Sequence, residues 1–489
     1  MNDSYEYGKQ ELPPQPKFAF GNKSSNICRL NHDSIPLLGL LLGSDGFWHV
    51  DGGPFPNFDH LGHFPEPKVR NKEANSNKVL VLVRSKGSHR IPRQFDSPTL
   101  DCFMDAKTED DHKPFKLSPG QRFAGWKVTR KLNEGGFGQV YIVERHGKQA
   151  ALKAESNDIE GGSAIKLEIS VLMLLNQKGH CPHVPHLYHA AKRKRYCYMI
   201  VTLLGENLRD LKLACPDEKM RPETWTRIGI QSLYSIKLLH DCGFVHRDIK
   251  PANFVMGHDH DPERARLVHI LDFGLARSYA FQRNGQWIAR RARATAEFRG
   301  TVRYCAPGVH LRQEQGRKDD IWSLMYMLIE FHCGLPWQKE REKEKLEMKK
   351  LNISDVHLLL KFPEECHQIV AHLRALDCYN RPNYSMIHEC LLKVMKRYNV
   401  SYAAPYDWED PQTVQVINAA RSKRADYEDA VEFFASDPLG INSAPPKDRT
   451  TTSDLGTNAT VEDNKEIENR VRNLNKNKNA SSRPKSLKQ

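Results

Sequence analysis

The stretch His246-Arg-Asp-Ile-Lys-Pro-Ala-Asn-Phe254 decides how the rest of this chain is interpreted. Its polar side chains are of the types that phosphoryl transfer requires. Asp248 can accept the proton of a hydroxyl group and orient that group, and Lys250 can neutralise a phosphate during transfer. Asn253 can supply an amide oxygen to Mg²⁺. A match this short can arise by chance, so the flanking sequence has to agree with it.

The second motif is Leu271-Asp272-Phe273-Gly274, which follows the first along the chain. Asp272 supplies a carboxylate that can bridge a metal ion to two phosphates. Mg²⁺ prefers oxygen ligands, so one carboxylate, one amide oxygen and the phosphates make a suitable shell. Asn253 and Asp272 are therefore the predicted metal ligands.

A glycine-rich stretch, Leu132-Asn-Glu-Gly-Gly-Phe-Gly-Gln-Val140, lies between two predicted strands. Glycine lets a backbone close over phosphates without Cβ clashes. Asn133 stands where such loops usually have their first glycine, and asparagine tolerates left-handed backbone angles. Taken alone, the stretch is better explained as a glycine-rich hairpin turn. The residues predicted to contact ATP here are Leu132, Asn133, Gly135, Gly136, Phe137, Gly138 and Val140.

A lysine lies inside the apolar strand Ala151-Leu152-Lys153. Burying its charge is costly unless the charge is paired. Phosphates and the carboxylate of Glu168, on the next predicted helix, would pair it. A lysine that faces water from an edge strand is the alternative interpretation. The order and spacing of all four motifs make a chance match remote.

The hydrophobic periodicity predicts a β-rich region followed by a helical one. We expect a two-lobed α+β fold with a ligand cleft between the lobes. The early elements are predicted to be strands at Trp126–Leu132, Gln139–Arg145 and Gln149–Glu155, a helix at Ile165–Gln177, and strands at His186–Ala190 and Tyr196–Leu203. The pattern is mainly helical from there to about Tyr398.

These segments resemble the protein kinase superfamily over about residues 120–400. Within it the chain resembles the casein kinase 1 group, and specifically its tau-tubulin kinase branch. Further carriers of this resemblance are Ala151-Leu-Lys-Ala-Glu-Ser156, Leu271-Asp-Phe-Gly-Leu-Ala-Arg277, Phe298-Arg-Gly-Thr-Val-Arg-Tyr304, the stretch Asp319–Glu330, Leu335-Pro-Trp337 and Asp407-Trp-Glu409. The resemblance implies a serine/threonine protein kinase that uses ATP and Mg²⁺.

The resemblance also assigns roles to single residues. Lys153, Glu168, Asp248 and Lys250 become the catalytic set. Val201 would control the back of the ATP pocket, with Thr202–Leu204 as the hinge, and Ala151 and Leu203 would contact the nucleotide. Asp320 would anchor the catalytic loop. Most kinases have a glutamate at the position of Gly308 in Ala306-Pro307-Gly308. Casein kinase 1-like enzymes also lack this glutamate.

Four segments are predicted from these patterns. They are a mostly disordered extension at 1–116, a protein kinase domain at 117–400, a helical extension at 401–435 and a disordered basic tail at 436–489. Eleven cysteines in a chain this long do not indicate a disulfide framework. No apolar run approaches the ~18 residues of a membrane span. We expect a cytoplasmic protein, with the nucleus as a second compartment.

The net charge of +13 favours acidic partners. Arginine is dense from Arg290 to Arg303, and guanidinium groups bind phosphate and carboxylate well. We predict a substrate-binding patch that selects acidic or phosphorylated proteins, with a solvated basic loop as the alternative. No nucleic acid partner is expected. The patch is predicted to comprise Arg299, Thr301, Arg303, Arg317 and Lys318.

Tubulin and microtubule-associated proteins are candidate substrates by analogy with the family alone. Two other classes of function stay open. One is a pseudokinase scaffold that binds ATP or partners without turnover. The other is a microtubule-binding protein in which catalysis is secondary and the segment Lys465 to Lys488 binds the acidic filament.

Overall fold

The computed structural model describes the backbone of β1 (Leu40–Leu42) and β2 (Trp48–Val50) and residues 116–135, 138–157, 163–177, 181–421 and 424–445. β1 and β2 pair antiparallel, within a stretch that the sequence predicts to be mostly disordered. The rest of 1–115 lies outside the described residues. Among the described helices, none is long and apolar enough to cross a bilayer.

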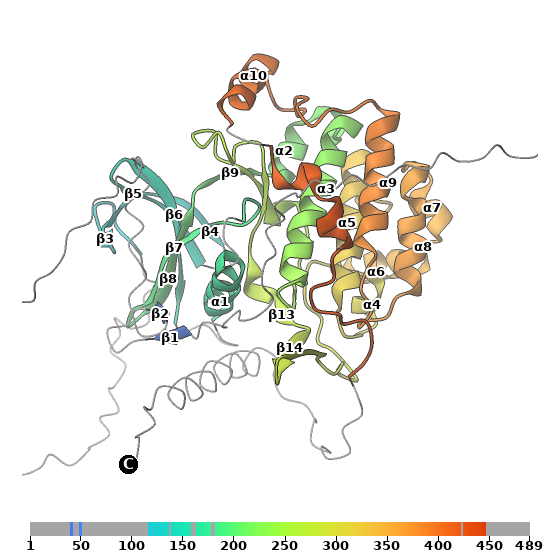
Figure 1. Ribbon diagram of the computed structural model, residues 1–489, viewed down its shortest axis with the longest axis horizontal. Coiled ribbons are helices and arrows are strands. Elements are labelled where there is room, and N and C mark those ends of the chain that lie inside the picture. The colour runs from blue at the N-terminus through green and yellow to red at the C-terminus, as the bar shows by residue number, and fades with distance from the viewer. Residues whose placement is uncertain are drawn as a thin grey trace, which may run out of the picture. The chain divides into compact units, whose positions relative to one another are not determined.

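A six-stranded antiparallel sheet forms the first lobe (Figure 1). Short turns join its first strands, and His146 and Gly147 both have positive φ in the turn before β6. The strands predicted from the sequence are all present, with ends shifted by a few residues. In sheet order they are β3 (Arg122–Phe123), β4 (Trp126–Gly135), β5 (Gly138–Arg145), β6 (Lys148–Ser156), β8 (Tyr196–Thr202) and β7 (Leu187–Lys192).

Helix α1 (Ala164–Gln177) packs on β7 and β8 of this sheet. The apolar side chains that recur at helical spacing, among them Ile165, Ile169 and Leu172, are almost completely buried. This burial fixes which face of α1 meets the sheet. It thereby fixes the direction of the remaining face, which carries Glu168.

The second lobe is helical and is built around α3 (Pro222–His240), which packs on α5 (Arg317–His332) and α9 (Tyr384–Arg397). Gly229 allows the close approach, because a Cβ there would lie 3.2 Å from Leu328 on α5 and 3.4 Å from Leu391 on α9. The other helices of this lobe are α2 (Leu208–Ala214), α4 (Pro307–His310), α6 (Lys343–Asn352), α7 (Asp355–Leu359) and α8 (His367–Ala375), with 3-10 turns η2 (Pro216–Glu218) and η5 (Glu364–Cys366).

Short antiparallel strand pairs position the motif-bearing loops on this lobe. β11 (Phe254–Gly257) pairs with β12 (Val268–Ile270) and with β9 (Leu204–Asn207). β10 (Phe244–Val245) pairs with β13 (Arg277–Ser278), and β14 (Ala280–Arg283) forms a hairpin with β15 (Gln286–Ala289). The loop that carries His246 to Asn253 thus runs from β10 to β11. We call residues 277–306, from β13 to α4, the activation segment.

The helical extension predicted at 401–435 contains three short elements. They are α10 (Pro411–Ala420), the 3-10 turn η6 (Asp426–Asp429) and α11 (Val431–Ala435). Pro411 occupies the first turn of α10, and the Asp410 side chain caps it by accepting from the backbone N–H of Thr413 at 2.9 Å. These local signals set where α10 begins.

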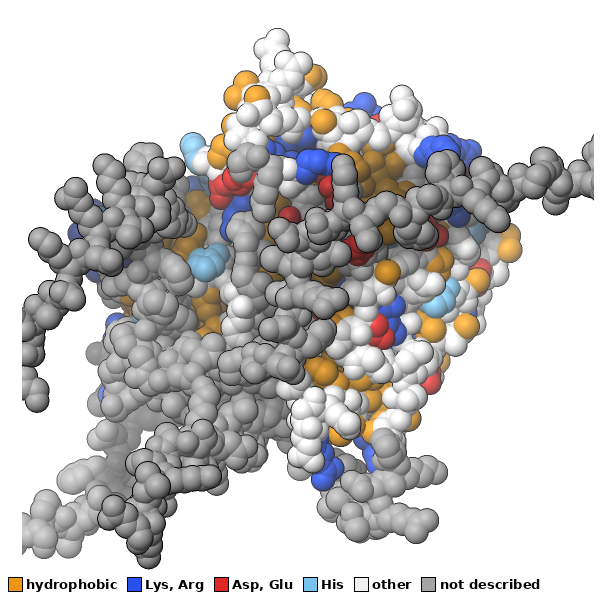
Figure 2. All heavy atoms as spheres, viewed as in Figure 1, with side chains coloured by type: hydrophobic (Ala, Val, Ile, Leu, Met, Phe, Trp, Pro, Cys, Tyr) orange, Lys and Arg blue, Asp and Glu red, His pale blue; other side chains and the backbone are white. Residues whose placement is uncertain are grey.

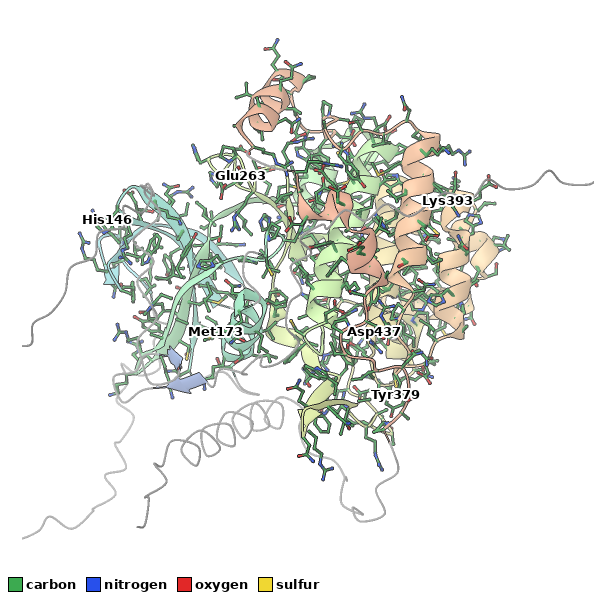
Figure 3. All side chains as sticks on the ribbon, in the orientation of Figure 1. His146, Met173, Glu263, Tyr379, Lys393 and Asp437 are labelled. Atoms are coloured by element: carbon green, nitrogen blue, oxygen red, sulfur yellow. The ribbon has the colours of Figure 1, made fainter. Side chains whose placement is uncertain are left out.

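The packed chain continues beyond residue 435, where the sequence predicts that the disordered tail begins. Phe434 is completely buried against Tyr234 and His388. Arg381 donates to the carbonyl oxygens of Phe434 and Ser436, at 3.1 and 2.6 Å. The segment through Asp437 runs along the helical lobe (Figure 3). The boundary at 436 was therefore wrong for residues 436–445, because long-range contacts order a polar segment.

We predict that Phe434→Ala lowers the free energy of unfolding by about 3–5 kcal/mol, because it leaves a cavity in the core of the helical lobe. Val431→Ala, three residues earlier on the same helix, is the matched control because Val431 is 64% exposed. The control is expected to stay within about 0.5 kcal/mol of the wild type. Urea unfolding followed by circular dichroism measures both, and equal stabilities would contradict the packing described here.

Candidate active site

The loop from His246 to Asn253 is held in place by the buried carboxylate of Asp320 on α5. Asp320 accepts the backbone N–H of His246 at 2.6 Å and that of Arg247 at 2.8 Å. It also contacts Nε2 of His240 at 2.9 Å. Burial raises the pKa of Asp320, but the contacts with His240 and the loop outweigh it and the pKa lies below its ordinary value. The charged carboxylate is thus the stable form, as an anchor requires.

A close approach between two loops brings Thr301 to Asp248. Gly300, with φ of 106°, makes it possible, because a Cβ there would lie 2.4 Å from the carbonyl oxygen of Arg247. The Thr301 hydroxyl donates to Oδ1 of Asp248 at 2.7 Å. Nζ of Lys250 lies 2.6 Å from Oδ2 of Asp248 and 3.2 Å from the Thr301 hydroxyl oxygen. The three side chains surround one point, where a substrate hydroxyl would meet both a carboxylate and an ammonium group.

Asn253 and Asp272 come together through the backbone and offer oxygen atoms. The N–H of Leu271 donates to the carbonyl of Asn253 at 2.8 Å. The amide nitrogen of Asn253 donates to the carbonyl of Asp248 at 2.9 Å, which leaves its side-chain oxygen as the available ligand. Asp272 has a left-handed φ of 65°. Among the described residues no three His, Cys, Asp or Glu side chains form a metal cluster. An amide and a carboxylate oxygen suit Mg²⁺ that is also bound by phosphates.

The buried lysine on β6 has its carboxylate partner. Nζ of Lys153 lies 2.6 Å from Oε2 of Glu168 on α1 and 3.6 Å from Oδ1 of Asp272. Burial disfavours its charge, but Glu168 and Asp272 outweigh burial and raise the pKa of Lys153 above its ordinary value. α1 contacts η4 (Phe273–Leu275), where a Cβ on Gly274 would lie 3.0 Å from that of Ala164. The contact places Lys153, Glu168 and Asp272 in one charge network.

The glycine-rich stretch forms the β4–β5 hairpin. Gly138 has φ of 109°, and a Cβ there would lie 2.3 Å from the carbonyl oxygen of Ala154, so glycine is required. Asn133 pairs with Val140 in the ladder and is not among the described residues with positive φ. Its tolerance of left-handed angles, suggested by the sequence, is not what accommodates it. Gly136 and Phe137 lie outside the described residues.

The residues predicted at the back of the nucleotide pocket lie in adjoining strands. Val201 on β8 is directly opposite Ala151 on β6, and Val140 on β5 is opposite Lys153. Val201 and Leu203 are buried, whereas Leu132 is 47% exposed. Their assignment to ATP binding stays a prediction.

The predicted substrate patch is smaller than the sequence suggests. Arg299 and Arg303 keep about a third of their side chains exposed, and each contacts a glutamate: Glu297 at 2.7 Å and Glu330 at 2.9 Å. Arg317, in contrast, is 2% exposed and donates to the carbonyls of Tyr379 and Ile441. Including Arg317 in a surface patch was wrong, because the C-terminal segment covers it.

Lys318 also differs from expectation. Its side chain is 13% exposed and lies 3.0 Å from Asp319. A further lysine, Lys350 on α6, was missed: it donates to the carbonyls of Val302 and Cys305 beside Thr301. Burial lowers its pKa to about 8. Nothing near Lys350 in the sequence marks it, because both of these partners lie in the activation segment, far from it along the chain.

Comparison with known proteins agrees with this geometry. Residues 126–393 match the family model described as "Protein kinase domain", and the chain belongs to the protein kinase family. The two-lobed fold predicted from the sequence is thereby confirmed.

Several similar proteins carry related names. The chain is 39% identical over 285 residues to "Inactive tau-tubulin kinase ttbk-6" of Caenorhabditis elegans, covering 57% of this chain and 97% of the relative. It is 40% identical over 287 residues to "Putative serine/threonine-protein kinase K06H7.1" of the same species, covering 58% and 82%. "Probable serine/threonine-protein kinase DDB_G0292354" of Dictyostelium discoideum is 34% identical over 287 residues, covering 58% and 56%.

We predict that Asp320→Asn lowers stability by about 2–3 kcal/mol and displaces the His246–Asn253 loop, because charged acceptors make the stronger hydrogen bonds. Since folding lowers the pKa of Asp320, its contribution is complete above the ordinary value near 3.8 and is lost as pH falls through the folded pKa. Denaturant midpoints from pH 7 down to pH 3 measure the difference. Asp355→Asn, at an exposed ion pair with Arg374, is the control. A difference that does not shrink toward pH 3 would contradict the charged anchor.

Proposed function

We propose that this chain is an active protein kinase that transfers the γ-phosphate of ATP to serine or threonine of protein substrates. The observation that supports it is the assembled site: Lys153 pairs with Glu168, and Asp248, Lys250 and Thr301 meet at one point. Kinase catalysis depends mainly on positioning and electrostatics, and it needs both the lysine–glutamate pair and the metal-binding aspartate in place.

Each step of the proposed reaction is assigned to a residue of this chain. Asp248 orients the substrate hydroxyl and takes up its proton as the oxygen bonds to the γ-phosphorus and the bond to the bridging oxygen breaks. Lys250 offsets negative charge on the phosphoryl group, and Lys153 orients the nucleotide phosphates. Asn253 and Asp272 would bind Mg²⁺, which neutralises charge on the β- and γ-phosphates. Thr301, whose hydroxyl donates to Asp248, lies beside the path of the substrate hydroxyl.

A relative named as inactive favours a second candidate, a nucleotide-binding or partner-binding scaffold without turnover. Loss of turnover in a kinase follows when a catalytic or metal-binding group is lost. The groups present in this chain include Lys153, Glu168, Asp248, Asn253 and Asp272. The complete set is what favours the enzyme over the scaffold.

We also propose a branch of the kinase family, a class of substrates and a cellular compartment, each supported by fewer observations. The resemblance supports the tau-tubulin kinase branch of the casein kinase 1 group, and the name of one relative contains tau-tubulin kinase. Tubulin and microtubule-associated proteins are therefore proposed substrates, and the cytoplasm and nucleus are the proposed compartments. Lys and Arg side chains lie at several separate places on the face drawn in Figure 2, some of them next to Asp or Glu, so a selective patch has to be local.

We predict that the purified full chain phosphorylates at least one of casein, tubulin and a phosphoserine-primed acidic peptide in the presence of ATP and Mg²⁺. Asp248→Asn is expected to lower kcat about 10³-fold or more, because the carboxylate that receives the proton is lost. Radiolabel transfer measures turnover, and nucleotide-dependent thermal shift measures binding separately. Nucleotide binding without transfer to any substrate would instead support the scaffold.

Arg299→Ala tests the selectivity for acidic substrates. We expect kcat/KM to fall about fivefold for the phosphoserine-primed peptide and to stay unchanged for a neutral peptide, which corresponds to one exposed charge contact of about 1 kcal/mol. Arg374→Ala is the matched control, since Arg374 also forms an ion pair and keeps 41% of its side chain exposed. Equal losses on both peptides would remove the patch hypothesis.

A further inference from the structure

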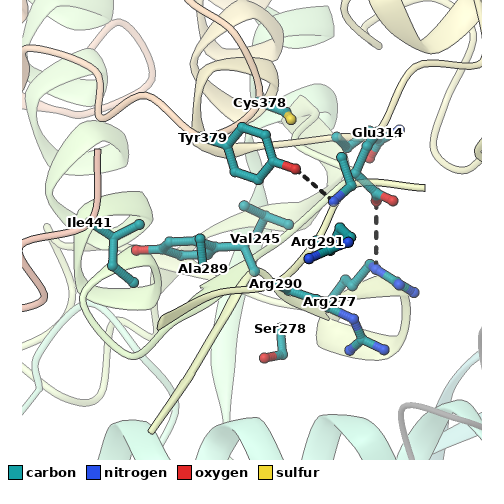
Figure 4. Close-up of a pocket in the computed structure, with 13 residues that line it drawn as sticks. Val245, Arg277, Ser278, Ala289, Arg290, Arg291, Glu314, Cys378, Tyr379 and Ile441 are labelled. Carbon is teal, nitrogen blue, oxygen red and sulfur yellow. Dashed lines mark hydrogen bonds and ion pairs between the residues drawn. The ribbon is translucent and has the colours of Figure 1, made fainter. Parts of the chain in front are cut away.

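A glutamate outside every motif joins the middle of the activation segment to the strand at its start. Oε2 of Glu314 lies 2.6 Å from Nε of Arg293, and Oε1 lies 2.9 Å from Nη2 of the same guanidinium. Nε of Arg277, on β13, lies 3.6 Å from Oε1 (Figure 4). Glu314 itself lies between α4 and α5, so one carboxylate joins three separate parts of the chain.

This carboxylate is buried enough for the contact to be strong. The Glu314 side chain is 11% exposed and that of Arg277 is 6% exposed. Burial raises the pKa of Glu314, but the hydrogen bonds from Arg293 and the charge of Arg277 outweigh it, and the pKa is below its ordinary value. Parallel hydrogen bonds from one guanidinium to both oxygens add geometric specificity to the charge pairing.

Backbone hydrogen bonds fasten the same stretch of the activation segment on both sides of Arg293. Its own N–H donates to Oε2 of Glu314 at 3.2 Å. The N–H of Ala292 donates to the Tyr379 hydroxyl at 2.8 Å, and the N–H of Ala296 donates to the carbonyl of Arg312 at 2.8 Å. Next to Glu314, Gln315 donates to the carbonyl of Arg299 at 3.0 Å. Residues 292–299 are therefore ordered from the region around Glu314.

Kinases that are switched on by phosphorylation order this segment when arginines pair with a phosphate group. Here a carboxylate already lies between two arginines, one at the start of the segment and one in its middle. We propose that Glu314 is a positioning residue that takes the place of an activating phosphate and keeps the activation segment ordered in the unphosphorylated chain. The proposal deepens the proposed kinase function, but the ordering itself requires no turnover.

Hydrogen exchange of the full chain tests the ordering directly. Glu314→Gln keeps the volume and removes the charge, and we expect the amides of Ala292, Arg293 and Ala296 to exchange at least about tenfold faster. Glu365→Gln is the matched control because Glu365 also pairs with an arginine, Arg397, on the helical lobe. Exchange in Glu314→Gln within twofold of the wild type would overturn the proposal. If Glu314→Gln does not fold, Arg293→Gln gives the same test from the other partner.

Phosphatase treatment tests whether the segment is ordered by the carboxylate of Glu314 or by a phosphate group on the segment itself. We expect the treated wild type, verified by mass spectrometry to lack phosphate on Ser278, Thr295 and Thr301, to keep its amide protection. Loss of protection after treatment would show that a phosphate orders the segment and would overturn the proposal.

Activity gives a second readout. With substrate saturating, Glu314→Gln is expected to lower kcat about tenfold with little change in the KM for ATP, and Glu314→Asp is expected to recover part of the loss. Equal kcat in Glu314→Gln and the wild type would overturn the role in catalysis. Should the wild type show no turnover, the kinase proposal fails while hydrogen exchange still decides whether Glu314 orders the segment.

Discussion

The buried carboxylate of Asp320 is the contact on which the active-site geometry depends. A charge removed from water is costly unless hydrogen bonds replace the water. Here the replacements are two backbone N–H groups of the loop and the ring of His240 on α3. The carboxylate of Asp320 thereby joins α3, α5 and the loop. If the loop moved away, this buried charge would lose the hydrogen bonds that compensate it. The position of Asp248 follows from this constraint.

Buried charges from the two lobes also compensate one another. Lys153 belongs to β6, Glu168 to α1 and Asp272 to the helical lobe. A buried charge is costly when it is unpaired, and Glu168 and Asp272 together offset the burial of Lys153 and raise its pKa above the ordinary value. The small residues Gly274 and Ala164 let α1 approach closely enough for this network to form. Packing of α1 and the electrostatics around Lys153 therefore depend on each other.

The sequence predicted much of this because the relevant signals are local. Strand and helix periodicity gave the sheet and α1, and the motif around Asp248 named the groups that the fold later brings together. Arg317 was misjudged because its partners, Tyr379 and Ile441, are distant in the sequence. Residues 436–445 were assigned to the disordered tail for the same reason. Composition indicates disorder only where no distant surface is available to bury a segment.

Net charge is a further example of what the sequence leaves undecided. The arginines from Arg290 to Arg303 look alike in the sequence, but the fold gives them different tasks. Arg293 binds the buried Glu314, and Arg303 binds Glu330 and the carbonyl of Gln338. Arg299 contacts Glu297, an exposed partner that a bound anion can replace at little cost. The proposed attraction for acidic substrates therefore depends on which arginines have exchangeable partners, and the total of +13 overstates it.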